Sequence, residues 1–587
     1  MHRVFLGVFI GALLAQTPEG PYKPAPGEVA GIRAKMAELK SSMKGDDPDV
    51  EIYYKAADWM LRDPAEFYTK AYLQNTLSVL DEGLARASDT KKSWTTAKNR
   101  VARAYRSRID GSVQPYVMTI PASYDPAVPA RLDVVLHGRA ATMNEVSFIV
   151  NKDKPATEKH LVMEVFGRTN NAYRWAGETD IFEAIESARS RYNVDPNRIV
   201  LRGFSMGGAG AWHIGLHYPS RWAAVEAGAG FTETVKYAKL KDPPGYVLST
   251  LHIYDAVDYA LNAVNVPFVG YGGEIDPQLQ ASRNIQEQLD REGLKPTALK
   301  ALFLVGPGTA HKFHPESKKE SDKFIDQAVA AGRTPPAHIR FVTYTPRYNE
   351  CFWLTVDELE KMYQRAEVDA TREQGRTTLS TKNIARITLQ DAGKITIDGQ
   401  ELAKGSTLEK INGKWRQAKE SKSLTKKHGL QGPIDDAFMD AFIAVNPPEQ
   451  LQREYSKWLR ADLPMKDAAS VTDKDMATHN LVLFGDPSNN TWIAKIAPKL
   501  PIRWSGGDIV AGGDRYSAAD HTLTMIYPNP LHPGRYVVLN SGHTFHDADF
   551  RGTNALLYPR LGDYAIIRKA DGKVVRAGLF DEHWQLH

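Results

Sequence analysis

The hydrophobic pattern divides the chain into three kinds of region. Between residues 29 and 110, apolar residues recur three and four positions apart, as in Ile52–Leu61 and Thr76–Leu84, which predicts amphipathic helices. Between residues 111 and 333, short apolar runs alternate with longer stretches of helical period. After Pro335-Pro336 the pattern changes to short runs that alternate apolar and polar residues, as β-strands do.

The middle region, 111–333, is predicted to hold a mostly parallel sheet. The apolar runs in it are Tyr116–Ile120, Leu132–Leu136, Leu161–Val165, Arg198–Leu201, Trp222–Ala227, Val266–Tyr271 and Leu299–Val305. Helical stretches, such as Asp180–Tyr192, separate several of them. Strands that alternate with helices indicate an α/β domain with helices on both faces of its sheet.

The rest of the chain is predicted to form two further domains, in line with a length of 587 residues. Residues 337–427 form a β-rich module with strands at Ile339–Tyr344, Phe352–Val356, Ile384–Leu389 and Lys394–Gly399. Residues 428–587 form a second, smaller α/β domain, with strands at Ala437–Val445, Asn480–Phe484 and Leu523–Tyr527 and a helix at Thr491–Ala497. Residues 29–110 form an N-terminal helical segment.

Composition and charge exclude several classes of protein. The 74 basic and 70 acidic residues leave a net charge of +4, too weak and too evenly spread to indicate a nucleic-acid partner. The one cysteine, Cys351, cannot form an intramolecular disulfide, and its neighbours Phe352–Leu354 predict a buried thiol. We find no cluster of metal ligands and no nucleotide-binding loop, so we expect no cofactor.

The N-terminus resembles a secretory signal peptide. His2-Arg3 precedes an apolar run, Val4–Leu14, that ends in small residues, which predicts a signal peptide over residues 1–15 and a linker over 16–28. A buried or tethering helix is the alternative. The run is too short to span a bilayer comfortably, and no later stretch approaches such a span. We therefore expect a secreted or periplasmic bacterial protein without an integral membrane span.

The most informative motif is a serine between glycines, Gly203-Phe204-Ser205-Met206-Gly207. It follows the apolar run that ends at Leu201 and precedes the helical stretch Ala209–Leu216. This order of strand, sharp turn and helix is the nucleophile elbow of the α/β-hydrolase fold. A serine at a helix N-terminus is also placed where an anion is stabilised. Ser205 is therefore the candidate nucleophile.

A serine nucleophile needs a histidine base and a carboxylate that orients it, in the chain order serine, acid, histidine. Asp276 follows the predicted strand Val266–Tyr271 and is the candidate acid, with Glu274 as the alternative. His311 follows the last predicted strand of the domain and is the candidate base. His314 competes with it, although it precedes a proline and is expected to open the next helix.

The tetrahedral intermediate of acyl transfer needs two N–H donors, the oxyanion hole. The amide of Met206, after the nucleophile, is the first candidate. The second is the amide of Gly138 or Arg139, after the strand Leu132–Leu136. The Arg139 side chain is also a candidate contact for an anionic substrate.

Residues from about 112 to 330 resemble prolyl-oligopeptidase-like serine hydrolases and the related secreted esterases. The resemblance rests on the following segments: Leu136–Gly138, Gly203–Gly208, Pro219–Gly228, Gly273–Asp276 and Ala310–Phe313. It implies Ser205 as nucleophile, Asp276 as acid and His311 as base. Oligopeptidases of that family carry a β-propeller before the hydrolase domain, whereas a helical segment stands there in this chain. A tunnel that admits only short peptides is therefore not expected.

These features predict a serine hydrolase that cleaves an ester or a peptide through an acyl-enzyme. The candidate substrates are esters, peptides and acylated carbohydrates, and residues 232–262 are a candidate lid. The alternatives are a catalytically silent binding protein with the hydrolase fold and a carbohydrate-binding polysaccharide esterase. No pattern in the sequence fixes the oligomeric state.

Overall fold

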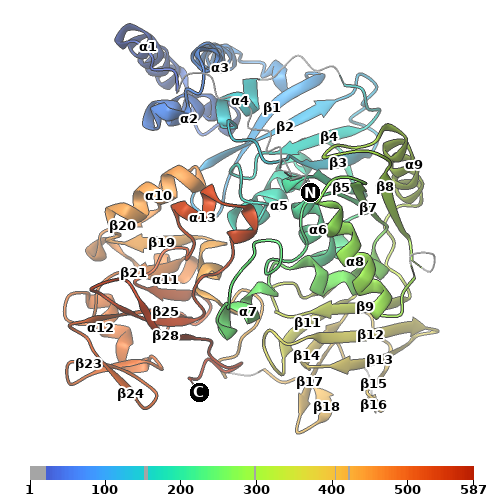
Figure 1. Ribbon diagram of the computed structural model, residues 1–587, viewed down its shortest axis with the longest axis vertical. Coiled ribbons are helices and arrows are strands. Elements are labelled where there is room, and N and C mark those ends of the chain that lie inside the picture. The colour runs from blue at the N-terminus through green and yellow to red at the C-terminus, as the bar shows by residue number, and fades with distance from the viewer. Residues whose placement is uncertain (1–20, 151–155, 296–298, 403–404, 421–422, 587) are drawn as a thin grey trace, which may run out of the picture. The chain divides into compact units, whose positions relative to one another are not determined.

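The computed structural model describes residues 21–586 except 151–155, 296–298, 403–404 and 421–422 (Figure 1). The chain forms two compact units, one of residues up to Ser93 with Thr142–Asn151 and one of all the others. The predicted signal peptide, 1–15, and the linker up to residue 20 lie outside the described residues. Among the described residues, no helix is both long enough and apolar enough to cross a bilayer.

The first unit is helical, as predicted. Its helices are α1 (Pro26–Ser42), α2 (Pro48–Arg62), α3 (Lys70–Ser88) and α4 (Glu145–Val150). α1 and α3 pack closely, because Gly83 on α3 leaves room for Leu39: a Cβ on Gly83 would lie 2.8 Å from the Leu39 side chain. In the core of this unit the buried pair Lys55 and Glu145 lies 3.4 Å apart.

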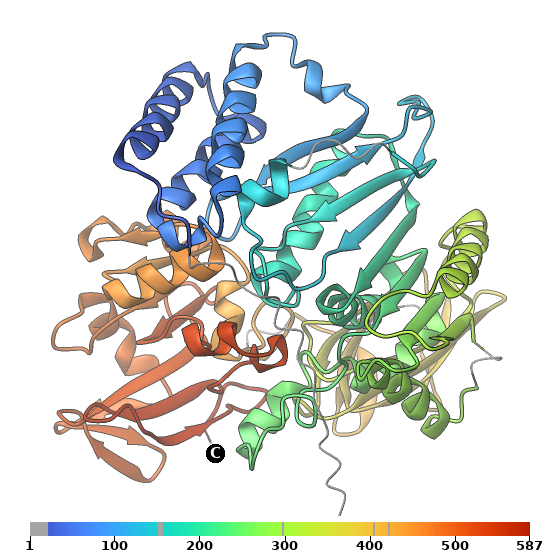
Figure 2. The same cartoon turned by 45° about the horizontal axis from the view of Figure 1, so that its top comes forward.

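The second unit begins with a twisted eight-stranded sheet, the predicted α/β-hydrolase domain (Figure 2). Its strands are β1 (Asn99–Arg106), β2 (Val113–Ile120), β3 (Ala130–Leu136), β4 (Leu161–Val165), β5 (Val194–Phe204), β6 (Ala224–Gly228), β7 (Phe268–Gly273) and β8 (Ala301–Gly306). Their order is β1-β2-β4-β3-β5-β6-β7-β8. β2 pairs antiparallel with both of its neighbours, and the other pairings are parallel.

Helices cover both faces of this sheet, because the strands bury side chains on both sides. On β5, Leu201 belongs to the core shared with α5 (Ala176–Arg189) and α6 (Met206–His217). The preceding residue, Val200, packs on the other face with Ile325 of α9 (Pro315–Ala331). A strand buried on both faces is an uninterrupted apolar run, which is why these strands were recognisable in the sequence.

The predicted boundary of the helical segment at residue 110 is wrong, because β1 lies within that range. Three arginines in the strand Asn99–Arg106 interrupt its run of apolar residues, so the sequence pattern did not reveal the strand. The strand pairs along its whole length with β2, from Asn99 opposite Ile120 to Arg106 opposite Val113. Arg103 is nevertheless buried, with 3% of its surface exposed.

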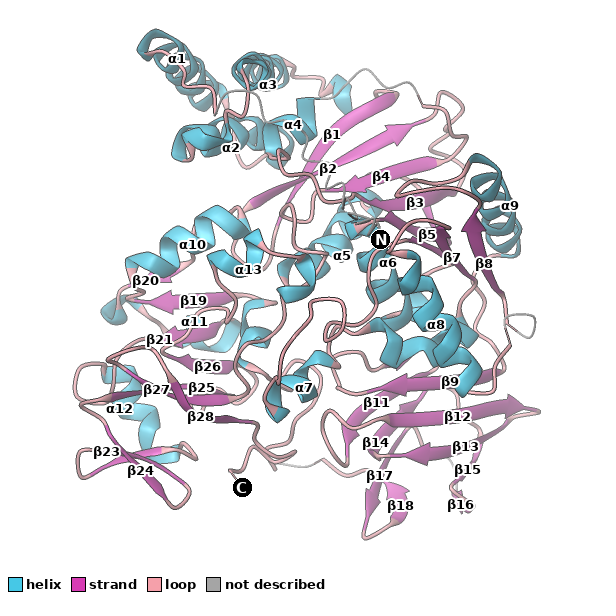
Figure 3. Ribbon diagram, in the orientation of Figure 1, coloured by secondary structure: helices cyan, strands magenta, loops and turns pink. Residues whose placement is uncertain are grey.

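The β-rich module after α9 contains two five-stranded sheets (Figure 3). The strands are β9 (His338–Thr343), β10 (Glu350–Cys351), β11 (Leu354–Leu359), β12 (Ala366–Glu373), β13 (Arg376–Lys382), β14 (Ile384–Leu389), β15 (Lys394–Ile397), β16 (Gln400–Leu402), β17 (Thr407–Ile411) and β18 (Lys414–Gln417). They enclose a core of their own, in which the Cys351 thiol is fully buried as predicted.

The C-terminal domain is built on a mixed seven-stranded sheet of order β20-β19-β21-β26-β25-β27-β28. Its strands are β19 (Phe442–Val445), β20 (Met465–Lys466), β21 (Asn480–Leu483), β25 (His521–Pro528), β26 (Tyr536–Leu539), β27 (Tyr564–Arg568) and β28 (Val574–Gly578). Its helices are α10 (Glu449–Leu459), α11 (Asp473–Thr478), α12 (Thr491–Ile496) and α13 (Asp547–Arg551), and a small sheet is formed by β22 (Arg503–Ser505), β23 (Asp508–Ala511) and β24 (Asp514–Ser517).

The predicted strand Ala437–Val445 is only half correct. The first part belongs to a short 3-10 helix, η6 (Ile434–Phe438), and only Phe442–Val445 forms a strand. Short apolar runs do not distinguish a buried helical turn from a strand. The overall fold class is confirmed: helical segment, α/β-hydrolase domain, β-rich module and a further α/β domain.

Candidate active site

Ser205 lies in a backbone conformation that its glycine neighbours make possible. Its φ is 59° and its ψ is −122°, at the turn between β5 and α6. Such a conformation costs a non-glycine residue about 1–3 kcal/mol. The turn is held because backbones pack very closely around it: a Cβ on Gly203 would lie 2.0 Å from the Gly207 oxygen, and one on Gly207 would lie 2.0 Å from the Leu136 oxygen. Neither position tolerates a side chain.

The structure brings Ser205, His311 and Asp276 together from the ends of three strands. The His311 Nε2 lies 2.8 Å from the Ser205 Oγ, and the His311 Nδ1 lies 2.7 Å from the Asp276 Oδ2. The other oxygen of Asp276 accepts a hydrogen bond from the Gln278 amide at 2.9 Å. Asp276 is 5% exposed, whereas the His311 side chain is 43% exposed, so the line runs from a buried acid to an accessible imidazole.

Glu274 and His314, the alternatives for the acid and the base, take no part in the hydrogen bonds that join Asp276, His311 and Ser205. The Glu274 carboxylate accepts a hydrogen bond from the Gly308 amide at 2.7 Å, and so braces the loop before the histidine. His314 is the N-cap of α9, as expected, and its buried Nδ1 has no hydrogen-bond partner among the described residues.

Tyr271 in β7 positions the histidine loop, a role that the sequence did not reveal. Its hydroxyl donates to the Lys312 oxygen at 2.8 Å and accepts from the His314 amide at 2.7 Å. Its ring stacks on Phe313 at 4.3 Å. The only signal in the sequence was its position at the end of the strand that precedes the acid.

The residues predicted for the oxyanion hole lie beside the serine. A Cβ on Gly138 would lie 3.6 Å from the Ser205 Cβ, so the loop of residues 137–140 after β3 passes over the nucleophile. Met206 is the first residue of α6, whose first amides have no acceptor within the helix. The amides of Gly138, Arg139 and Met206 donate no hydrogen bond to any residue that the structure describes.

The Arg139 guanidinium is already engaged. It donates to the Gly552 oxygen at 2.6 Å and to the Arg551 oxygen at 3.3 Å, both in the C-terminal domain. The suggested contact with an anionic substrate is therefore not favoured, because these two carbonyls occupy the side chain.

The predicted lid is shorter than residues 232–262. From Ala256 to Asn265 the chain forms a 3-10 helix, η4, that is packed into the hydrolase core, with Tyr259 and Ala260 fully buried. α7 (Gly245–Leu251) belongs instead to a small separate cluster, in which Val247 and Leu251 are buried with Tyr558. Asp255 closes this segment through a 2.6 Å hydrogen bond from the Thr234 hydroxyl, and burial raises the pKa of its carboxyl to about 7.

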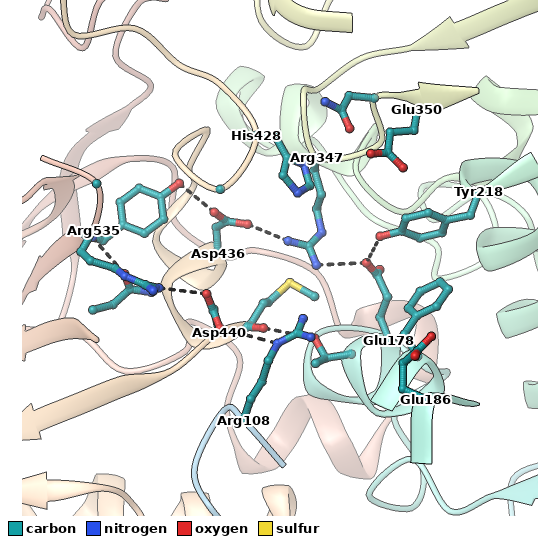
Figure 4. A pocket seen from close by; sticks show the side chains of 18 of the residues that line it. Arg108, Glu178, Glu186, Tyr218, Arg347, Glu350, His428, Asp436, Asp440 and Arg535 are labelled. Atoms are coloured by element: carbon teal, nitrogen blue, oxygen red, sulfur yellow. Dashed lines mark hydrogen bonds and ion pairs between the residues drawn. The ribbon is translucent and has the colours of Figure 1, made fainter. Parts of the chain in front are cut away.

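A second cluster of charged residues lines a cavity of about 340 Å³ at the junction of the hydrolase and C-terminal domains (Figure 4). Arg347 bridges two carboxylates there, at 3.0 Å from Glu178 on α5 and 2.9 Å from Asp436 on η6. Glu178 also accepts a hydrogen bond from His213 of α6 at 2.9 Å. Burial alone would raise the pKa of Glu178, but Arg347 and the donors around it hold that pKa well below its ordinary value.

Comparison with known proteins supports the assignment of the catalytic domain. The model of the prolyl oligopeptidase family matches residues 169–254, which include Ser205 but neither Asp276 nor His311. No curated protein matches the chain. Within the described residues, no group of three or more potential ligands could hold a metal ion.

Several solved structures are similar to about two fifths of the chain. A thermostable esterase has 18% identity and a TM-score of 0.29, over 40% of this chain and 64% of the esterase, just under two thirds of its length. S-formylglutathione hydrolase of Staphylococcus aureus has 16% identity and a TM-score of 0.30, over 39% and 98% of the two chains. A ferulic acid esterase of the fungus Anaeromyces mucronatus has 14% identity and a TM-score of 0.28, over 40% and 91%.

The elbow after β5, the sheet that supports it and the family match agree with one another. The chain contains a domain of the α/β-hydrolase fold, and the segment around its candidate nucleophile is similar to the prolyl oligopeptidase family.

Proposed function

We propose that the protein hydrolyses an ester or a peptide through an acyl-enzyme on Ser205, with His311 as general base and Asp276 as the residue that orients it. The hydrogen bond from His311 Nδ1–H to Asp276 leaves the Nε2 lone pair directed at the Ser205 hydroxyl. His311 takes the serine proton as the Oγ attacks the carbonyl carbon, and Asp276 stabilises the imidazolium that forms.

The remaining steps use the same groups. The tetrahedral oxyanion accepts hydrogen bonds from the amide of Met206 and from that of Gly138 or Arg139, which have no acceptor among the described residues. His311 then donates its proton to the departing alkoxide or amine. A water molecule deprotonated by His311 attacks the acyl carbon, and the collapse of the second intermediate releases the acid and restores the Ser205 hydroxyl.

The acyl or leaving group is proposed to bind in a cavity of about 440 Å³ whose lining reaches the neighbours of Ser205 but includes neither Ser205 nor His311. Gly138 and Phe204, which flank Ser205, line the cavity together with Phe313. Its far wall is charged: Arg202 pairs with Asp133 at 2.7 Å and with Glu226 at 2.8 Å. Because these charges are already paired, the aromatic end next to the serine favours an apolar or aromatic group of the substrate.

The observation that carries the proposal is the continuous line from Asp276 through His311 to Ser205, at 2.7 and 2.8 Å. The test is a panel of p-nitrophenyl acyl esters, aromatic acyl esters and proline-containing peptides, assayed with the wild type and with Ser205→Ala. We expect the wild type to hydrolyse at least one class and the variant none. Equal turnover by the two proteins would contradict the role of Ser205 as nucleophile. No turnover by the wild type would contradict the proposal as a whole and favour the silent binding protein.

Export from the cell is a separate proposal and rests on residues 1–15 alone. Deleting residues 2–15 is expected to retain the protein in the cytoplasm of an expressing bacterium, while the full chain is found in the periplasm or medium. Immunoblots of the cell fractions measure this. The same distribution for both proteins would contradict export.

A further inference from the structure

The loop of residues 137–140 is held from outside the hydrolase sheet. The Asn170 side-chain amide donates to the Ala140 oxygen at 2.9 Å, and its oxygen accepts from the Ala140 amide at 3.1 Å. One residue earlier, Arg139 reaches the Gly552 and Arg551 oxygens in the C-terminal domain. These are carbonyls at the end of α13, where a helix leaves acceptors unpaired.

The same C-terminal segment also holds Asn170. The Asn554 side-chain amide donates to the Asn170 backbone oxygen at 2.7 Å. Arg139, Asn170 and Asn554 thereby form one connected set of hydrogen bonds, which begins on the loop next to Ser205 and ends on residues 551–554.

The C-terminal segment of residues 545–557 is itself firmly anchored to the hydrolase domain. Arg174, 3% exposed, donates to the Leu557 oxygen at 2.6 Å. Trp175 stacks on Phe545 with ring centres 3.7 Å apart. The segment is therefore a fixed support, and the set of hydrogen bonds transmits its position to the loop.

From this geometry we infer that Arg139 and Asn170 are positioning residues for the oxyanion hole, and that residues 545–557 of the C-terminal domain are a required part of the catalytic machinery. The inference rests on the proposed function. Oxyanion donors act only at about 2.7–3.1 Å from the position of the developing charge. A misplacement of about 1 Å costs roughly 10²-fold in rate. The side chain of Arg139 acts through the backbone of its own loop and does not touch the substrate.

The inference predicts a loss confined to the transition state. In Arg139→Met and Asn170→Ala, kcat for a soluble ester should fall about 10–10²-fold, with KM changed by less than about twofold. The affinity for a trifluoromethyl ketone, whose adduct places an oxyanion in the hole, should fall by the same factor as kcat/KM. Arg139→Lys keeps a donor on a flexible stem and should recover part of the loss.

The matched control is Thr179→Val. It removes another hydrogen bond between the two domains, from the Thr179 hydroxyl to the Met439 oxygen at 3.1 Å, without touching the loop. Its kcat should equal that of the wild type, and the thermal midpoints of all variants should show that they are folded.

If the wild type is active, two results would overturn this inference and leave the proposed function standing. One is a kcat of Arg139→Met and Asn170→Ala within about twofold of the wild type, a difference too small for a lost oxyanion donor. The other is a loss in Thr179→Val as large as theirs, which would mean that general domain attachment is responsible. A wild type without ester or peptide turnover would overturn the proposed function and this inference together.

Discussion

Two histidine–carboxylate pairs in the hydrolase domain have nearly the same geometry and different surroundings. His311 lies 2.7 Å from Asp276, and His213 lies 2.9 Å from Glu178. In the first pair the carboxylate binds Nδ1, and the free Nε2 meets the Ser205 hydroxyl. In the second pair the carboxylate binds Nε2, and the free, buried Nδ1 meets no donor among the described residues.

The two pairs also differ in how far their histidines are exposed to solvent. The His311 side chain is 43% exposed, whereas His213 is 3% exposed and lies between Tyr254 and Tyr348. The carboxylate of the second pair also binds Arg347, which connects it to the C-terminal domain. We therefore expect that a hydrogen-bonded histidine and acid are not sufficient for catalysis. A nucleophile at the second ring nitrogen and access for a substrate make the first pair the candidate base, and the second serves as a structural connection.

The largest expected difference between the pairs is in rate. His311→Gln should lower kcat by about 10⁴–10⁶-fold, because the serine loses its base. His213→Gln retains a donor for Glu178 and should keep kcat within about twofold of the wild type. Ester hydrolysis at saturating substrate measures both. A His311→Gln enzyme with wild-type kcat would assign the base to another residue, and His314→Gln is the next variant to assay.

The two acids should differ in the same way. Asp276→Asn is expected to lower kcat by about 10⁴-fold, because an amide at that position favours the wrong imidazole tautomer. Glu178→Gln, which makes the same replacement of a carboxylate oxygen by an amide nitrogen in the other pair, should leave kcat per folded molecule unchanged. Comparable losses in the two variants would mean that the buried cluster participates in catalysis.

The charged cluster around the second pair should matter for the stability of the fold and not for the rate. Arg347→Ala leaves the buried carboxylates of Glu178 and Asp436 without their cation, which is expected to cost about 3–5 kcal/mol in the free energy of unfolding. The control Arg453→Ala removes an exposed arginine from α10 and should change that energy by less than about 0.5 kcal/mol. Urea titrations followed by tryptophan fluorescence measure both, and equal midpoints would contradict the structural role.

The smallest effect is a pH dependence of stability. Burial lowers the pKa of His213 from its ordinary value of 6.5, despite the neighbouring Glu178. The unfolded chain therefore binds more protons below pH 6.5 than the folded chain, and stability falls as the pH falls, by at most about 1.4 kcal/mol per pH unit from this residue. His213→Gln should reduce the stability difference between pH 7.5 and pH 5. An unchanged difference would show that His213 does not titrate in this way.

The sequence predicted those parts of the molecule whose structure depends on residues close together in the chain. The central strands β6 and β7 are buried on both faces and have few charged residues. The elbow around Ser205 needs glycines where neighbouring backbone leaves no room for a Cβ. The chain order serine, acid, histidine then limited the choice to Asp276 or Glu274 and to His311 or His314. The structure places Asp276 and His311 in one line with the serine.

Contacts between distant segments were beyond the reach of sequence patterns. Arg139 and Gly552 lie 413 positions apart, and no periodicity signals that they meet. Arg347 has no special neighbours in sequence, yet it connects three parts of the fold. β1 was missed because its arginines hide a strand. The last two residues of η6, Ala437 and Phe438, were included in a strand because the apolar run there is too short to show a period.

The position of a covalent label tests directly whether Ser205 is the activated nucleophile. A fluorophosphonate reacts with a serine only when a base has activated its hydroxyl, and digestion followed by tandem mass spectrometry identifies the modified residue. We expect a single adduct on Ser205, formed at the wild-type rate in His213→Gln and far more slowly in His311→Gln. An adduct on another serine, or the same labelling rate in both histidine variants, would contradict it.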